Sequence, residues 1–82
     1  MNTPKSTAYK IYLLPPAQKA LDIPAPDVQR RLVASLRTLA IEPRPIESVK
    51  LTPDEGFRVD FGDFRVLYRI DEKNRRVYIY KI

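Results

Sequence analysis

Residues 57–70 show the clearest pattern in the chain, because apolar and polar side chains alternate on both sides of Gly62 and Asp63. Alternation is the period of a β-strand, and a two-residue connection with glycine in first place favours a type II′ hairpin turn. Counting outward from this turn predicts five facing pairs: Phe61 with Phe64, Asp60 with Arg65, Val59 with Val66, Arg58 with Leu67, and Phe57 with Tyr68. The hairpin then has one apolar face that can be buried and one face that carries Arg58, Arg65 and Arg69.

Three further segments are predicted to be strands, namely residues 8–14, 48–51 and 77–82. The second is short enough to be an edge strand. If Ile70 faces Val77, then Tyr78 and Tyr80 of the last strand lie on the same face as the hairpin arginines. The last strand reads VYIYKI, which suggests an exposed apolar edge that a partner strand or helix would cover.

Two helices are predicted between the first and second strands, over residues 16–23 and 28–41. The first begins with a proline, which suits the first turn of a helix, and the second follows Asp27, a plausible N-cap or first-turn acid. An apolar stripe at helical spacing lets the second helix cover a sheet; its main members are Val28, Leu32, Leu36 and Leu39. The chain is therefore predicted to be one α+β domain, residues 1–82, with an antiparallel sheet of four to five strands and both helices on its apolar face. The polar residues 1–7 are predicted to be a loose terminus.

The composition limits the chemistry that this chain can perform. With no Cys and no His, it cannot form a Cys/His zinc site, a Cys or Ser-His nucleophile or a disulfide, and two glycines make no phosphate-binding loop. No metal or cofactor is predicted. The sequence contains no membrane span or secretory signal, which favours a cytoplasmic protein.

A formal net charge of +5 favours polyanionic partners, nucleic acid first, although such a charge can also serve only solubility. Arg58 and Arg65 are the candidates for holding a phosphate; the alternative is that they are solvated charges and that Arg65 pairs with Asp60. The candidates for further RNA contacts are Lys50, Arg69, Tyr78, Tyr80 and Lys81, of which the tyrosines could stack on bases or serve only as strand formers. The three helix arginines, Arg30, Arg31 and Arg37, lie mostly off the apolar stripe and are either solvated or meet an acidic partner.

Four segments in this order resemble the RelE/ParE superfamily of toxins from toxin–antitoxin pairs: the first strand followed by PPAQKAL, the helix ending in RTLAIEPRP, SVKL, and FRVDFGDFRVLYRIDEKNRRVYIYKI. The last segment is the most specific, since a Gly-Asp hairpin followed by aromatic-Arg-Val-Leu-Tyr is close to that family's pattern. The resemblance covers nearly the whole chain. It implies a compact α+β toxin around which a protein antitoxin wraps, with acidic antitoxin residues meeting the three helix arginines.

Members similar to RelE cleave mRNA in the ribosomal A site without a catalytic His, whereas members similar to ParE poison DNA gyrase. By resemblance, Arg58 lies where RelE-like enzymes carry a catalytic Lys or Arg, and Arg65 lies where they carry the Arg just after the hairpin aromatic. The resemblance therefore implies a metal-independent endoribonuclease that acts on translated mRNA. Its implied partners are a protein antitoxin, mRNA on the ribosome, and operator DNA only through the antitoxin complex.

Two features depart from the RelE pattern. Asp60 stands where RelE carries a second basic residue, and it would pair with Arg65 across the hairpin. The Gly-His-Arg-like segment and the C-terminal Tyr of many relatives do not follow Ile82 in this sequence. Both departures favour an alternative function, that of a catalytically inactive or ParE-like binding module, which would inhibit gyrase or join an antitoxin–operator complex.

Overall fold

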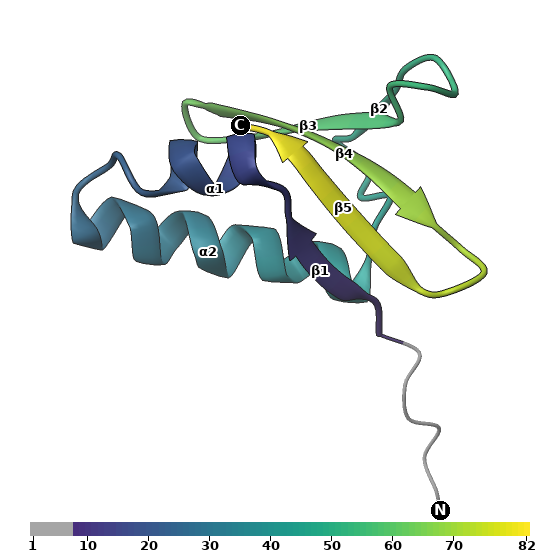
Figure 1. Cartoon of the computed structure of the whole chain (residues 1–82), viewed down its shortest axis with the longest axis horizontal. Helices are drawn as coiled ribbons and strands as arrows, with labels where there is room; N and C mark the ends of the chain where they lie inside the picture. The colour runs from purple at the N-terminus through teal and green to yellow at the C-terminus, as the bar shows by residue number, and fades with distance from the viewer. Residues whose placement is uncertain (1–7) are drawn as a thin grey trace, which may run out of the picture.

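The computed structural model describes residues 8–82, and the predicted loose terminus, residues 1–7, lies outside this range. Seven elements follow one another along the chain: β1 (Lys10–Leu13), α1 (Pro15–Leu21), α2 (Pro26–Ile41), β2 (Val49–Lys50), β3 (Phe57–Phe61), β4 (Phe64–Asp71) and β5 (Arg76–Lys81) (Figure 1). This order is the predicted one. The α+β class predicted from the sequence is therefore confirmed.

The five strands form one sheet in the order β1-β5-β4-β3-β2. All neighbouring strands are antiparallel except β1 and β5, which pair in parallel with Lys10 beside Arg76 and Leu13 beside Ile79. The prediction that the last strand forms an exposed edge is wrong, because β5 lies between β1 and β4. The two edges of the sheet are β1 and the two-residue strand β2, which was predicted as an edge.

The β3–β4 hairpin has the predicted register, since all five facing pairs from Phe57–Tyr68 to Phe61–Phe64 are present. Gly62 has φ +61°, while Asp63 is not among the described residues with positive φ. A positive φ at the first loop position alone is the pattern of a type II′ turn. Val59 and Val66 face each other at the centre of the hairpin and are completely buried, so the predicted apolar face does enter the core.

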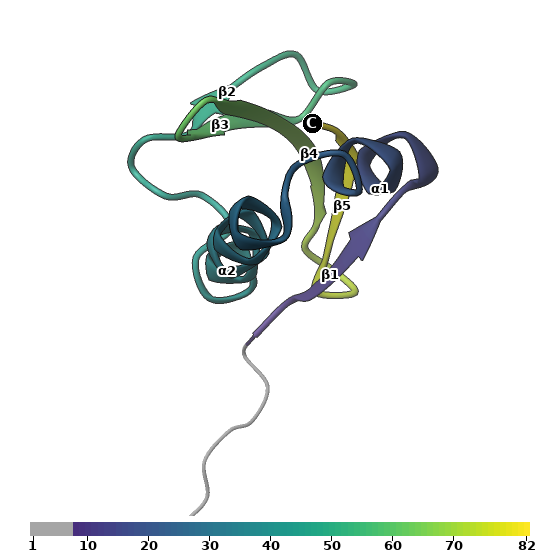
Figure 2. The same ribbon diagram turned by 90° about the vertical axis from the view of Figure 1, so that its left-hand side faces the viewer.

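Both helices begin with a proline in their first turn, where the missing backbone N–H needs no partner. For this reason α1 starts at Pro15 and α2 at Pro26, slightly earlier than predicted, and Asp27 lies in the first turn of α2. The sheet curves around α2, whose buried stripe consists of Leu32, Leu36 and Leu39 (Figure 2). No helix within residues 8–82 has the length and apolar character that crossing a bilayer requires.

The core lies between the two helices and one face of the sheet. Its buried residues are Ala17, Leu21, Leu32, Leu36, Leu39, Val59, Val66, Tyr68, Val77 and Ile79. Tyr68, predicted as a core residue, is fully buried, and its hydroxyl donates to the backbone carbonyl of Pro43 at 2.8 Å. Burial raises the pKa of this hydroxyl, so it remains a donor throughout the physiological range. No helix within residues 8–82 covers the opposite face of the sheet.

Candidate functional site

The face of the sheet turned away from the helices is here called the outer face. The registers of β3, β4, β5 and β1 place on it six cationic and two acidic residues, namely Lys10, Arg58, Arg65, Arg69, Arg76, Lys81, Asp60 and Asp71. Tyr12, Tyr78 and Tyr80 stand among them. The strand pairing therefore confirms that Arg58, Arg65, Arg69 and Tyr78 share one face, as predicted. The contact of Arg69 with the ring of Tyr80 places Tyr80 on the same face.

An open cavity of about 590 Å³, here called the basic cleft, lies at one end of the outer face. Three cationic side chains line it, Arg58 from β3, Arg65 from β4 and Lys81 from β5, with Leu67 between them. Glu55 and Asp63 are the two acidic residues of its lining. The structure thus brings together the two arginines that the sequence singled out for holding a phosphate.

Arg58 and Arg65 have different surroundings within the cleft. The Nε atom of Arg58 is buried and has no hydrogen-bond partner among the described residues. A buried donor without an acceptor carries a free-energy cost. Arg65 places its Nε 3.5 Å from Oδ1 of Asp60, as the cross-strand register predicts, with both side chains more than half exposed. Such a surface pair adds little stability but lowers the positive potential beside Arg65.

Lys81 reaches the cleft because of an irregularity in β5. Leu67 pairs with Lys81 and Tyr68 with Ile79, so the ladder leaves Tyr80 as an extra residue. A bulge of this kind breaks strict alternation, and both Tyr80 and Lys81 turn toward the outer face. Alternation alone would have put Lys81 on the helix side.

Lys50, predicted as an RNA contact, is not brought into the cleft. Lys50 pairs with Phe57, whereas its neighbour Val49 pairs with Arg58. Facing residues of paired strands share a side of the sheet, so Lys50 lies on the side of Phe57 and away from Arg58. This exposed lysine on a short edge strand fits the role of protecting the edge from other strands.

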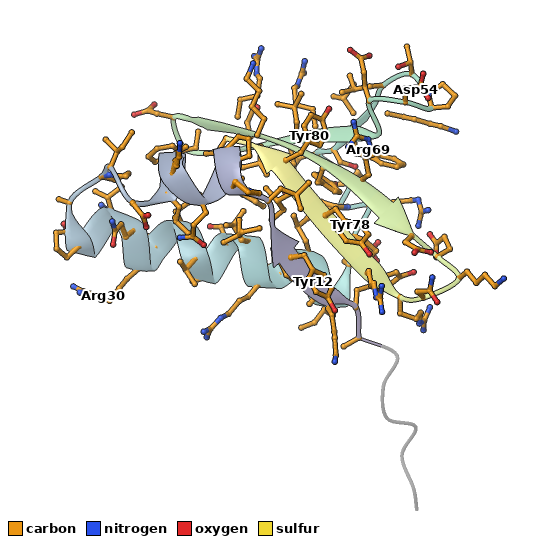
Figure 3. All side chains as sticks on the ribbon, viewed as in Figure 1. Tyr12, Arg30, Asp54, Arg69, Tyr78 and Tyr80 are labelled. Atoms are coloured by element: carbon orange, nitrogen blue, oxygen red, sulfur yellow. The ribbon has the colours of Figure 1, made fainter. Side chains whose placement is uncertain are left out.

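Arg69 and Tyr80 hold the turn between β2 and β3 against the sheet (Figure 3). The Nε of Arg69 donates to the carbonyl of Asp54 at 2.6 Å, and the hydroxyl of Tyr80 donates to the carbonyl of Glu55 at 2.7 Å. The guanidinium of Arg69 also lies 4.2 Å from the ring centroid of Tyr80. These two residues, predicted to contact RNA, therefore shape one wall of the basic cleft.

Gly56 completes this turn. Its φ is +83°, and a Cβ atom at this position would lie 2.3 Å from the carbonyl oxygen of Tyr68. Only glycine combines this backbone conformation with such a close approach to β4. The contact of this turn with β4 is a tertiary feature that the local sequence pattern does not contain.

Tyr78 forms a second group on the outer face with a residue that the sequence analysis missed. Its ring stacks on that of Tyr12 with 5.4 Å between centroids, and its hydroxyl accepts a hydrogen bond from Arg76 at 3.2 Å. The same guanidinium lies 5.6 Å from the Tyr12 ring, and this hydrogen bond raises the pKa of Arg76. The sequence pattern did not indicate Tyr12, because only the parallel pairing of β1 with β5 places it beside Tyr78.

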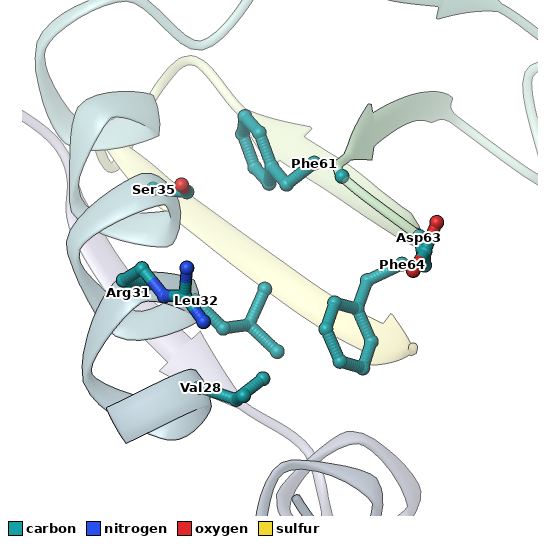
Figure 4. A pocket seen from close by; sticks show the side chains of 8 residues that line it. Val28, Arg31, Leu32, Ser35, Phe61, Asp63 and Phe64 are labelled. Atoms are coloured by element: carbon teal, nitrogen blue, oxygen red, sulfur yellow. The ribbon is translucent and has the colours of Figure 1, made fainter. Parts of the chain in front are cut away.

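The three arginines of α2 divide between two surfaces. Arg30 and Arg37 line a shallow groove on α2 together with Val33 and Ala34. Arg31 lies on a different side, where α2 and the β3–β4 hairpin enclose an apolar groove of about 360 Å³ (Figure 4). Arg31 also lies 3.9 Å from Asp27, one helical turn earlier. The three arginines therefore do not form one contact surface.

Glu72 ties the β4–β5 turn to two distant segments. It accepts a hydrogen bond from the hydroxyl of Tyr9 at 2.5 Å and forms an ion pair with Arg44. The hydrogen bonds from Tyr9 and Arg44 lower the pKa of this carboxyl below that of an ordinary glutamate. Within residues 8–82, no three His, Cys, Asp or Glu side chains come together to hold a metal ion.

Comparison with known proteins gives structural matches only. No protein-family model matches the sequence, and no curated protein does. The archaeal RelE–RelB complex from Pyrococcus horikoshii contains a chain with a TM-score of 0.77 and 28% identity, over 92% of both chains. The RelBE2 toxin–antitoxin complex of Mycobacterium tuberculosis contains a chain with a TM-score of 0.76 and 24% identity, over 92% of this chain and 95% of that chain.

A third match is to a toxin in its free state. The free toxin RelE of E. coli, in a mutant form, superimposes with a TM-score of 0.69 and 18% identity, over 89% of this chain and 79% of that chain. A likeness at this identity shows a shared fold. Because the archaeal match extends the likeness to 28% identity, the resemblance found in the sequence is confirmed, and the chain is RelE-like over about nine-tenths of its length.

Proposed function

We propose that this chain is the toxin of a toxin–antitoxin pair and that it cleaves translated mRNA at the ribosome. The matched chains come from RelE–RelB complexes, which supports the toxin assignment and a protein antitoxin as partner. Operator DNA would then be reached only through the antitoxin complex. The proposal that the chain cleaves mRNA is supported by the basic cleft.

The observation that carries the RNA proposal is the basic cleft. RNA cleavage by its own 2′-hydroxyl builds negative charge on the phosphate, and fixed cations aimed at that charge lower the barrier. Arg58 and Arg65 both line this cleft, and a guanidinium can hold phosphate oxygens through two N–H groups. Lys81 adds a third positive charge to the same cavity.

The test is to incubate the purified protein with ribosomes that carry a defined mRNA and to map the ends of the message. We expect cuts at the codon in the A site, and we expect Arg58→Ala and Arg65→Ala to reduce them. Intact message at a large excess of protein would overturn the nuclease proposal. Toxicity on induced expression, relieved by the neighbouring small gene, tests the toxin assignment independently.

For the antitoxin, we propose two separate contacts on α2. Arg30 and Arg37 flank Val33, so their groove suits a segment with acidic residues beside an apolar one. Arg31 would make a different contact, at the mouth of the groove between α2 and the hairpin. Charge reversal of Arg30 and Arg37 together, compared with reversal of Arg31 alone, measures the two contacts in a co-purification assay.

One observation favours the alternative function, a binding module without catalysis. Asp60 lies beside Arg65 and offsets part of its charge, which weakens the cleft as a phosphate site. A ParE-like protein that acts on gyrase would tolerate this pairing. A supercoiling assay with purified gyrase separates the two functions. Inhibition of gyrase by a protein that leaves mRNA intact on programmed ribosomes would favour the binding module.

A further inference from the structure

We infer that Glu55 is the general base of the cleavage reaction. This inference rests on the proposed function and adds one catalytic residue to it. Removing the proton of a ribose 2′-hydroxyl requires an acceptor, and the three cations of the basic cleft are donors. An Arg remains charged and is a poor base. Among the described residues, only two acidic side chains line the cleft, those of Glu55 and Asp63.

Glu55 is the better anchored of the two carboxylates. Its Oε1 accepts a hydrogen bond from the hydroxyl of Thr52 at 2.9 Å, and its backbone N–H donates to the carbonyl of Thr52 at 3.0 Å. Its own carbonyl is held by Tyr80. Asp63, in contrast, lies at the tip of the hairpin and also lines the groove on the helix side.

This anchoring leaves part of the carboxylate available. A carboxylate has about four lone-pair positions on its two oxygens, and the hydroxyl of Thr52 uses one of them. The turn that carries Glu55 is fixed to the sheet by Arg69 and Tyr80 and by the close approach of Gly56 to β4. Arg69 and Tyr80 are therefore positioning residues, which hold Glu55 at the wall of the cleft.

The proposed cleavage step requires no reactant other than RNA and water. The Glu55 carboxylate takes the proton of the 2′-hydroxyl, and the 2′-oxygen forms a bond to the adjacent phosphorus. The bond from phosphorus to the 5′-oxygen breaks, and the 5′-oxygen takes up a proton from water. The products are a 2′,3′-cyclic phosphate and a 5′-hydroxyl end, while Arg58 and Arg65 stabilise the charge on the phosphate during the transfer.

A purely structural role for Glu55 is the competing explanation. Thr52 and Glu55 have the spacing of a capping box, in which a Glu stabilises a turn through its side chain. The substitution Glu55→Gln separates the two roles. The amide oxygen of Gln can still accept the hydrogen bond from Thr52, but the amide cannot take up a proton.

The experiment compares wild type, Glu55→Gln, Asp63→Asn and Glu47→Gln on programmed ribosomes. We expect Glu55→Gln to lower the cleavage rate about 10²- to 10⁴-fold with unchanged affinity for RNA blocked at the 2′-position. We expect Glu47→Gln, an exposed change outside the cleft, to leave the rate unchanged. The acidic limb of the rate against pH should disappear in Glu55→Gln and remain in Asp63→Asn.

The other charged side chains that line the cleft with Glu55 are Arg58, Arg65, Lys81 and Asp63, and all remain in this variant. If Glu55→Gln does not fold, Glu55→Asp provides the test: slower cleavage with the acidic limb retained supports the base, and a wild-type rate overturns it. Active wild type with equal activity in Glu55→Gln overturns the inference and leaves the proposed function intact. Wild type that cleaves no RNA overturns the proposed function itself.

Discussion

The hydroxyl of Tyr80 lies 2.7 Å from the backbone carbonyl oxygen of Glu55, so a side chain of the last strand holds the turn that precedes β3. Segments far apart in the sequence thereby meet on the outer face. The basic cleft depends on this contact, because the turn is one of its walls. Tyr80, a candidate for RNA contact, therefore also contributes to the stability of the fold.

The first prediction concerns this hydrogen bond. Tyr80→Phe should lower the free energy of unfolding by about 0.5 to 1.5 kcal/mol, since it removes one hydrogen bond while keeping the ring that Arg69 covers. Urea denaturation measures the change. Tyr78→Phe is the matched control, because the hydroxyl of Tyr78 bonds only the side chain of Arg76 in the same strand and holds no distant segment. A larger loss of stability in Tyr78→Phe than in Tyr80→Phe would contradict the assignment.

The two glycines of the chain should differ in their response to alanine. Gly56→Ala should cost about 2 to 4 kcal/mol, because it combines backbone strain at φ +83° with a clash against the carbonyl of Tyr68. Gly62→Ala should cost only about 1 to 2 kcal/mol, because its φ of +61° is strained but nothing lies within 4 Å of the added atom. Equal losses in thermal and urea unfolding would show that the turn at Gly56 does not pack on β4.

Asp60→Asn should strengthen RNA binding. Removing the carboxylate 3.5 Å from Arg65 raises the positive potential of the cleft, with a gain of about 0.2 to 1 kcal/mol in binding free energy. Stability should change by less than about 1 kcal/mol, because both side chains are largely exposed. Fluorescence anisotropy with a single-stranded RNA measures the affinity, and weaker binding would argue that Asp60 itself contacts the ligand.

Lys50 and Lys81 should behave differently in the same assay. Lys81→Ala should weaken RNA binding and reduce the slope of log affinity against log salt by about 0.7, the value for one phosphate contact on a single strand. Lys50→Ala carries the same charge change on the other side of the sheet and should leave both quantities unchanged. If both variants lost affinity equally, net charge rather than the cleft would govern binding.

Low pH should reduce the stability that the contacts of Glu72 give to the fold. Its pKa in the folded state is lowered from an ordinary 4.5, so the carboxylate stabilises the fold above that pH and the contribution is lost as the pH falls below it. Glu72→Gln should flatten this part of the stability curve, by at most about 1 kcal/mol because the side chain is half exposed. Urea unfolding over a series of acidic pH values measures it, with Glu47→Gln as the exposed control.

The hairpin could be predicted pair by pair because two local features determine it. Side chains alternate with a period of two, and a two-residue turn leaves one register that buries both Val59 and Val66. The shared face of Arg58 and Arg65 follows from that register. The starts of both helices could be predicted to within two residues, because prolines mark the first turn of each helix.

The remaining features depend on contacts between distant segments. No local pattern shows that β1 pairs in parallel with β5, and this pairing made the edge prediction wrong and hid Tyr12. The bulge at Tyr80 is one residue long and reverses the side of Lys81. The role of Arg69 and Tyr80 likewise depends on where the turn at Gly56 packs, which is decided by tertiary structure.

The central position of β5 has a consequence for the order in which the molecule is made. β1 and α1 leave the ribosome first, yet β1 has its neighbour in the sheet only after residues 76–81 have emerged. Pairings this distant in sequence form slowly, because a long loop must close before the contact is made. Lys81 lies in the same strand, so a nascent chain carries no assembled basic cleft until β5 has emerged.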